Sequence, residues 1–173
     1  MKIRRAAPSD FQSIAAIHAE SWKDSYADEL PAEFLAGRID RVLVRYWREI
    51  EIQREDVVLV AEEDSLAGFA AIWCRPIPFL DNLHVIPSQR SQGVGSALMR
   101  AAAKELIRKG HQTAYLWVFE NNKRALRFYE RLGGVQKEQA RKSVFGYKVP
   151  SRKIIWDDLS ILLRFSRFSC RQE

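Results

Sequence analysis

The chain has few cysteines and few histidines, and neither kind is grouped as metal ligands are. Cys74 and Cys170 lie far apart in the sequence and show no metal-ligand spacing. The three histidines, His18, His84 and His111, are equally scattered. We therefore expect free thiols and no metal site.

Long apolar runs are also missing. No stretch approaches the roughly 20 apolar residues of a membrane span, and residues 1–8 lack the apolar core of a signal peptide. Repeats and low-complexity linkers are absent as well. A chain of 173 residues with 47% hydrophobic and 29% charged residues predicts one soluble domain with a substantial core, in the cytoplasm.

The sequence centres on a loop between an expected strand and an expected helix. Alternation over residues 79–85 predicts a strand with two distinct faces. One face would carry Phe79, Asp81, Leu83 and Val85, and the other Leu80, Asn82 and His84. After the loop, apolar residues recur at intervals of four and predict a helix over about residues 93–109, with the stripe Val94, Leu98, Ala102 and Leu106.

This loop has the features of an anion site. The first N–H groups of a helix are free and partially positive, which favours phosphate near Gly93, Val94, Gly95 and Ser96. Arg90 adds a guanidinium suited to pyrophosphate. A P-loop lysine and the third glycine of a dinucleotide fingerprint are both missing. The alternative is a plain turn whose glycines serve backbone geometry.

A second pattern follows the next expected strand, at residues 113–119. Residues 121–132 predict a helix that begins at Asn121 or Asn122 and carries Tyr129 on its inner face. The asparagine could simply be an N-cap, and Tyr129 could be a core residue whose hydroxyl finds a partner.

The remaining pattern predicts elements on either side of these motifs. Pro8 begins a helix in which His18 reads as a packed face residue, and a second helical region runs over residues 35–50. A short strand begins at Ile3, and the other expected strands cover residues 56–62, 66–74, 135–143 and 152–156.

Together, Arg90-x-x-Gly93-x-Gly95 and Asn122-x-x-Ala125-x-x-Phe128-Tyr129 resemble the GNAT superfamily of acyl-CoA-dependent N-acyltransferases in order and spacing. The resemblance covers residue 1 to about residue 158. It implies a single α/β domain of the α+β type, with a mixed, mostly antiparallel sheet of about six to seven strands and helices on both faces. Residues 159–173 would be a C-terminal extension of unclear role.

The resemblance also implies an enzyme that moves an acetyl group from acetyl-CoA to a primary amine. The Val85 N–H would polarise the thioester carbonyl, and Tyr129 would protonate the departing thiolate. The expected cofactor-binding residues are Leu83, Val85, Arg90, Ser91, Gln92, Gly93, Val94, Gly95, Ser96, Asn122, Ala125 and Tyr129.

A proton acceptor for the attacking amine is less clear from the sequence. The candidates are Asp81 and His84, with Glu120 third, and His84 has the better intrinsic pKa. Strict alternation would aim Asp81 and His84 at opposite faces. Either residue could instead serve a hydrogen-bond network, with solvent taking the proton.

The acceptor side carries no readable signature. Trp22 and Tyr26, one helical turn apart, are candidate walls of an acceptor pocket, with aromatic core as the alternative. A small amine, an amino acid, an aminoglycoside-like drug and a protein amine all stay open. The net charge of +6 disfavours a polycationic acceptor unless an acidic pocket exists.

Two other functions compete with the enzyme. Basic stripes on the two helices could make the chain a nucleic-acid-associated acyltransferase, although a solvated face is the more common reason for such stripes. A non-catalytic acyl-CoA-binding domain is the other alternative. We expect no membrane partner, no nucleic acid in the favoured interpretation and, from the resembling family, a homodimer.

Overall fold

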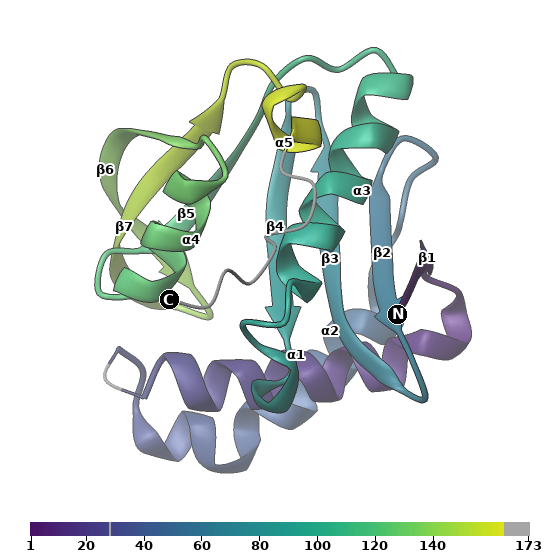
Figure 1. The fold of residues 1–173 in the computed structure, drawn as a ribbon. Coiled ribbons are helices and arrows are strands. Elements are labelled where there is room, and N and C mark those ends of the chain that lie inside the picture. Colours follow the sequence, from purple (N-terminus) through teal and green to yellow (C-terminus); the bar gives the residue numbers. More distant parts are fainter. Residues whose placement is uncertain (28, 165–173) are drawn as a thin grey trace, which may run out of the picture.

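The protein is a mixed sheet with helices on both faces (Figure 1). The computed structural model describes residues 1–27 and 29–164 of the 173. The sheet has the order β1-β2-β3-β4-β5-β7-β6, and every neighbouring pair is antiparallel except β4 and β5. Its strands are β1 (Lys2–Arg5), β2 (Val57–Glu62), β3 (Leu66–Cys74), β4 (Pro78–Val85), β5 (Ala114–Phe119), β6 (Val135–Val144) and β7 (Tyr147–Trp156).

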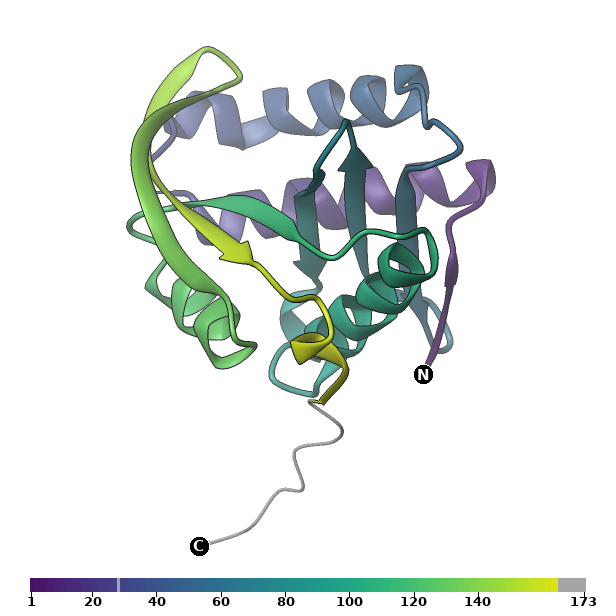
Figure 2. The ribbon, with the colours of Figure 1, turned by 90° about the horizontal axis from the view of Figure 1, so that it is seen from above.

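Two layers of helices cover the sheet, one on each face (Figure 2). One layer consists of α1 (Phe11–Ser25), the π-helix η2 (Phe34–Arg38) and α2 (Ile39–Glu49). The other consists of α3 (Val94–Arg108), α4 (Lys123–Arg131) and α5 (Ile161–Arg164), while short 3₁₀ turns η1 (Pro8–Asp10) and η3 (Pro87–Gln89) precede α1 and α3. The expected fold class is confirmed.

None of the helices in the described part of the chain combines the length and the apolar character needed to cross a membrane.

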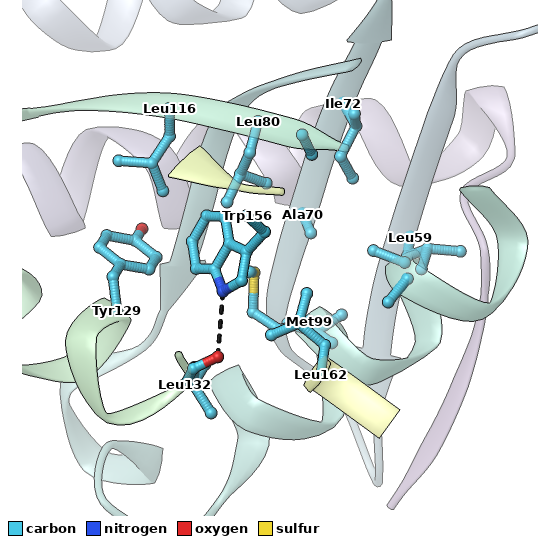
Figure 3. Packing of buried hydrophobic residues seen from close by; sticks show 14 of the residues in the cluster. Leu59, Ala70, Ile72, Leu80, Met99, Leu116, Tyr129, Leu132, Trp156 and Leu162 are labelled. Carbon is cyan, nitrogen blue, oxygen red and sulfur yellow. Dashed lines mark hydrogen bonds between the residues drawn. The ribbon is translucent and has the colours of Figure 1, made fainter. Parts of the chain in front are cut away.

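The larger core lies between the sheet and the α3–α4 layer (Figure 3). Trp156 at the end of β7 is fully buried, and its Nε1–H donates to the Leu132 carbonyl at 3.0 Å. The predicted stripe of α3 is buried in the same cluster, because intervals of four return a side chain to one helical face. Tyr129 packs edge-on against Trp156, with ring centroids 5.9 Å apart.

The C-terminal extension begins inside this core. Leu159 and Leu162 are buried in the cluster, so residues 159–164 pack on the domain. The domain boundary at residue 158 stays a prediction. Residues 165–173, with Cys170, lie outside the described residues, whereas Cys74 is a free thiol whose pKa burial raises to about 11.

The last strand is longer than the sequence predicted. It begins at Tyr147, not at residue 152, and pairs with β6 from Val144 onward. Pro150 lies within the added part of the strand, although proline donates no hydrogen bond to a ladder. In the structure its carbonyl accepts the Glu120 N–H at 2.9 Å, and the strand continues through it.

The expected faces of β4 were wrong in one respect. Ala71 of β3 pairs with Asn82, but the next residue, Ile72, pairs with Leu80, so Asp81 is an extra residue in a β-bulge. Leu80 therefore faces the α3 layer, while Asp81 and Asn82 both face the α1 layer. Asp81 consequently shares a face with His84, which the alternation had excluded.

Candidate functional site

A cleft passes through the sheet where β4 and β5 separate. The two parallel strands make a single ladder pair, Phe79 with Tyr115. Beyond that pair lies a cavity of about 1700 Å³ that is lined from both faces of the sheet. The loop before α3 and the helix α4 border one end, and α1 with the β6–β7 hairpin borders the other.

The N-terminus of α3 presents free backbone donors to the cleft. Gly93 is the N-cap and adopts φ 84°, a left-handed conformation that glycine tolerates. The first intrahelical hydrogen bond runs from the Ala97 N–H to the Gly93 carbonyl. The N–H groups of Val94, Gly95 and Ser96 precede it and have no acceptor within the helix. This is the geometry that binds phosphate at helix N-termini.

Gly95 allows α4 to approach this loop closely. A Cβ atom at this position would lie 3.2 Å from the Phe128 ring and 3.9 Å from Cγ2 of Val85. The absent side chain therefore permits the close packing of α3 against α4 and β4 at this point of the cleft lining.

Arg90 ties the loop to α1. Its Nε donates to the Val85 carbonyl at 3.1 Å, and its Nη1 is in close contact with the Asp24 carboxylate. The guanidinium lines the cleft and is largely buried by these contacts. Its expected role toward a pyrophosphate stays a prediction, and its link to α1 was not foreseen.

Asn122 is the N-cap of α4. Its Oδ1 accepts a hydrogen bond from the Ala125 N–H at 3.0 Å, as expected for an N-cap residue. The side chain also hydrogen-bonds to Tyr26, whose pKa burial nevertheless raises to about 12. Asn122 and Ala125 both line the cleft, so the cap and a ligand contact are compatible.

Tyr129 lies on the cleft wall with its ring in the core. Burial, with a smaller contribution from Tyr26, raises the pKa of Tyr129 above its usual value of 10.0. The phenol is therefore protonated at neutral pH, as a proton donor must be.

Two histidine rings pack against each other in the α1-facing wall, tilted by 31°. The rings of His18 and His84 lie 4.6 Å apart, and His84 Nδ1 hydrogen-bonds with Ser21 Oγ at 2.8 Å. Burial, helped by the positive charge of Arg90, lowers the pKa of His84 to about 3. His84 is consequently neutral but a weak base.

His18 is packed and buried, as the sequence indicated. The Nε1–H of Trp47 donates to its Nδ1 at 3.2 Å, so the neutral ring carries its hydrogen on Nε2. Burial, and then His84, lower the pKa of His18 well below 6.5. Nε2 has no partner in the described part of the chain, and the residue borders the cleft.

Asp81 reaches the same wall through the bulge. Its Oδ2 accepts hydrogen bonds from Trp73 Nε1 at 2.9 Å, from Asn82 Nδ2 at 2.9 Å and from the Tyr46 hydroxyl at 3.4 Å. One side of the residue is open to the cleft, while the surrounding protein desolvates the rest and raises the pKa of Asp81. The carboxylate is thus a stronger base than an ordinary aspartate.

Glu120 has a different environment. It accepts Arg152 Nη2 at 2.6 Å, and this hydrogen bond lowers the pKa of Glu120. Glu120 is not among the described residues that line the cleft. The third candidate base is therefore an ion-pair partner on the neighbouring strand.

Trp22 and Tyr26 do form an aromatic wall of the cleft. The Tyr26 ring packs 4.3 Å from Phe119, and Trp22 lies 5.3 Å from Phe145 at the tip of the β6–β7 hairpin. Trp22 Nε1 is buried without a partner among residues 1–27 and 29–164.

Sequence reasoning missed the rest of this wall. The cleft-lining positions of α1 and its C-cap follow the spacing i, i+3, i+4, i+7 and i+8, a signal that could have found them: His18, Ser21, Trp22, Ser25 and the C-cap Tyr26. No local signal marks Phe119, because it is brought there by strand pairing. Residues 1–27 and 29–164 contain no cluster of three or more potential metal ligands.

Comparison with known proteins agrees with this geometry. Residues 12–134 match the Acetyltransferase (GNAT) family. YuaI of Bacillus subtilis, named as an uncharacterized N-acetyltransferase, is 25% identical over 92% of this chain and 95% of its own length. An aminoglycoside N(6')-acetyltransferase type 1 of Klebsiella aerogenes is 30% identical over 58% of this chain and 66% of its own.

A solved structure shares the fold. The PaiA N-acetyltransferase of Thermoplasma acidophilum, in complex with coenzyme A, superposes with a TM-score of 0.66 at 22% identity, over 87% of this chain and 96% of that one. The family match covers most of the sheet, the loop before α3 and the α4 motif. The chain therefore belongs to the GNAT family of acetyltransferases.

Proposed function

We propose that the protein transfers an acetyl group from acetyl-CoA to a primary amine. The observation that carries this proposal is the cleft through the sheet at the β4–β5 separation. Helix N–H donors suited to phosphate border one end, and the Asp81 carboxylate borders the other. A phosphorylated donor and an amine can thus approach each other from opposite faces.

The donor end fits acetyl-CoA. Bound there, acetyl-CoA would supply a thioester carbonyl for attack by the amine. The loop 90–96 would hold the pyrophosphate, and Leu83 and Val85 would hold the pantetheine arm along β4, with the Val85 N–H polarising the carbonyl. Asn122 and Ala125 border the same path.

Asp81 is our choice of proton acceptor. Amines are mostly protonated near neutral pH, so attack requires removal of a proton. Asp81 faces the acceptor side and has a raised pKa, whereas the pKa of His84 is too low for effective proton capture. His84 would instead hold Ser21 and the α1 wall in place through its 2.8 Å hydrogen bond.

Tyr129 is our choice of proton donor to the leaving sulfur. It lies on the opposite wall from Asp81, on α4, and its raised pKa keeps it protonated. The two groups therefore have opposite protonation states at neutral pH, as acid and base in one turnover require.

The first test is calorimetric titration of acetyl-CoA followed by a thiol-release assay with a panel of amines. Saturable binding with amine-dependent thiol release supports the proposal. Tyr129→Phe should bind acetyl-CoA normally but lose about 100-fold in kcat. The control Tyr147→Phe removes a hydroxyl that lies outside the cleft lining and should retain activity.

Other results would favour the alternatives. Binding without thiol release for any amine would favour an acyl-CoA sensor. No binding by correctly folded protein would contradict the enzyme and bring the basic surface forward. The predicted homodimer and cytoplasmic location stay predictions.

A further inference from the structure

The acceptor end of the cleft has a distinct charge pattern. Among the described side chains that line the cleft, Asp81 is the single carboxylate, and five side chains are cationic. Four of the cations, Arg90, Arg100, Arg124 and Arg131, belong to the loop before α3, to α3 and to α4, on the donor side. The fifth, Lys142, comes from β6 and lies on the acceptor side.

An aromatic surface holds Lys142 in place. Its Nζ lies 4.7 Å from the centroid of Trp117, within the range of a cation–π interaction. In residues 1–27 and 29–164, Lys142 makes no ion pair with a carboxylate. Its charge is therefore positioned by the ring and is available to an anion in the cleft.

A second lysine strengthens this positive region. Lys153 Nζ lies 5.1 Å from the Tyr115 ring and 5.8 Å from the Trp117 ring. It also pairs with Glu138 at 3.3 Å, so part of its charge is already compensated. Lys142 is thus the principal cation of this surface.

The Asp81 carboxylate and this region share one face of the sheet. Phe79 stacks on Tyr115 at 5.1 Å on the face that carries α1, and Trp117 follows two residues along β5 on that same face. The bulge turns Asp81 to this face as well. An acceptor in the cleft therefore meets a carboxylate from β4 and a cation above β5.

We infer that the acceptor carries one primary amine and one carboxylate or phosphate group, with the amine at Asp81 and the anion at Lys142. The inference rests on the proposed transferase function. A polyamine or aminoglycoside would place a second ammonium near Lys142, and like charges there repel. The inferred acceptor thus differs from the aminoglycoside in the name of one relative.

The test compares paired amines that differ by the anion alone. Glycine, 4-aminobutanoate and 6-aminohexanoate are each assayed against the alkylamine of matching length, and phosphoethanolamine is assayed against ethylamine. Rates are compared at equal concentrations of neutral amine. We expect at least one anionic member to exceed its partner about tenfold in kcat/KM, and added salt to reduce this ratio. The carboxylate and phosphate series identify which anion is preferred.

Variants at Lys142 give the decisive readout. Lys142→Met keeps an unbranched side chain over Trp117 and removes the charge, so the ratio within a pair should fall close to one. Lys142→Arg should restore the preference. Lys148→Met is the matched control, because Lys148 lies on the same hairpin, opposite Ser143, but does not line the cleft. It should retain the wild-type ratio.

Contrary outcomes are separable from a failure of the transferase proposal. Equal rates within every pair, a best rate with a diamine or kanamycin, or a preference unchanged in Lys142→Met would each overturn the inference while acetyl transfer stands. If no amine is acetylated, the transferase proposal fails, and a binding measurement then tests the anion site by itself. Calorimetric binding of 6-aminohexanoate but not hexylamine, lost in Lys142→Met, supports the anion site, and equal or absent binding overturns it.

Discussion

The two ends of the cleft are built in different ways. At the donor end, consecutive residues of the first turn of α3 supply the backbone N–H groups, and the helix orients them. At the acceptor end, the lining comes from α1, a bulge in β4, the end of β5 and a hairpin far along the chain. A short motif is sufficient for the first kind of site, whereas the second requires the finished tertiary structure.

The largest effect should come from placing a charge at the donor end. Ser96→Asp adds a carboxylate in the first turn of α3, where it favours the helix but repels phosphate. We expect acetyl-CoA affinity to fall about 1000-fold with an unchanged melting temperature.

Calorimetry measures the acetyl-CoA affinity of Ser96→Asp, and thermal unfolding measures its melting temperature. Ser65→Asp makes the same charge change in the exposed β2–β3 turn, away from the cleft lining, and should keep wild-type affinity. Unchanged affinity in Ser96→Asp would place the donor's phosphates elsewhere.

A smaller effect, confined to turnover, should follow from changing the bulge. Asp81→Asn removes the proposed base but keeps a side chain of the same shape, so kcat should fall about 100-fold while acetyl-CoA affinity persists. Wild-type activity should decline as the pH drops through the raised pKa of Asp81, because protonation removes the base.

The same substitution has an expected sign for stability. The raised pKa means that folding disfavours the ionised carboxylate, so Asp81→Asn should leave the melting temperature equal or slightly higher. A variant with full activity would return the role of base to solvent. Loss of acetyl-CoA binding in this variant would contradict the separation of the two ends.

The smallest effect is on the pH dependence of the free energy of unfolding. It should arise from the two histidines of the acceptor wall alone. The pKa values of His18 and His84 are lowered in the folded protein, so below pH 6.5 the unfolded chain binds protons that the folded chain does not. The contribution of His84 is complete above pH 6.5 and is lost as the pH falls toward about 3, and the lowered pKa of His18 acts in the same direction. Each imidazole can lower the free energy of unfolding by up to about 1.4 kcal/mol per pH unit.

Urea unfolding between pH 6.5 and 5 measures this slope. His84→Gln should reduce it by roughly half, because one of the two buried imidazoles is removed. His111→Gln replaces a histidine outside the cleft and serves as the control. An unchanged slope in His84→Gln would show that His84 binds protons as readily in the folded protein as in the unfolded chain.

Much of the donor end could be predicted from sequence because its signals are local. The four-residue spacing from Val94 to Leu106 predicted the buried stripe of α3, and Gly93 marked the N-cap. Asn122 was one of two candidates for the N-cap of α4, and the structure selects it. These features depend on residues within a few positions of one another.

The acceptor end was only partly predictable. Trp22 and Tyr26 were predicted as neighbours one turn apart and both line the cleft, but their partners Phe119 and Phe145 arrive through strand pairing. The alternation rule misplaced Asp81, because a bulge is a property of two paired strands and leaves no mark in one of them. The low pKa of His84 likewise depends on burial under α1 and on Arg90.

The sequence by itself determined the family, the order of elements and the loop whose N–H groups face the cleft, since periodicity, capping and glycine conformation act over a few residues. Only the tertiary structure decided which strands separate, which face receives Asp81, and which lysine stands above Trp117. These outcomes follow from contacts between residues tens of positions apart, and their geometry exists only once the sheet and its two helical layers have assembled.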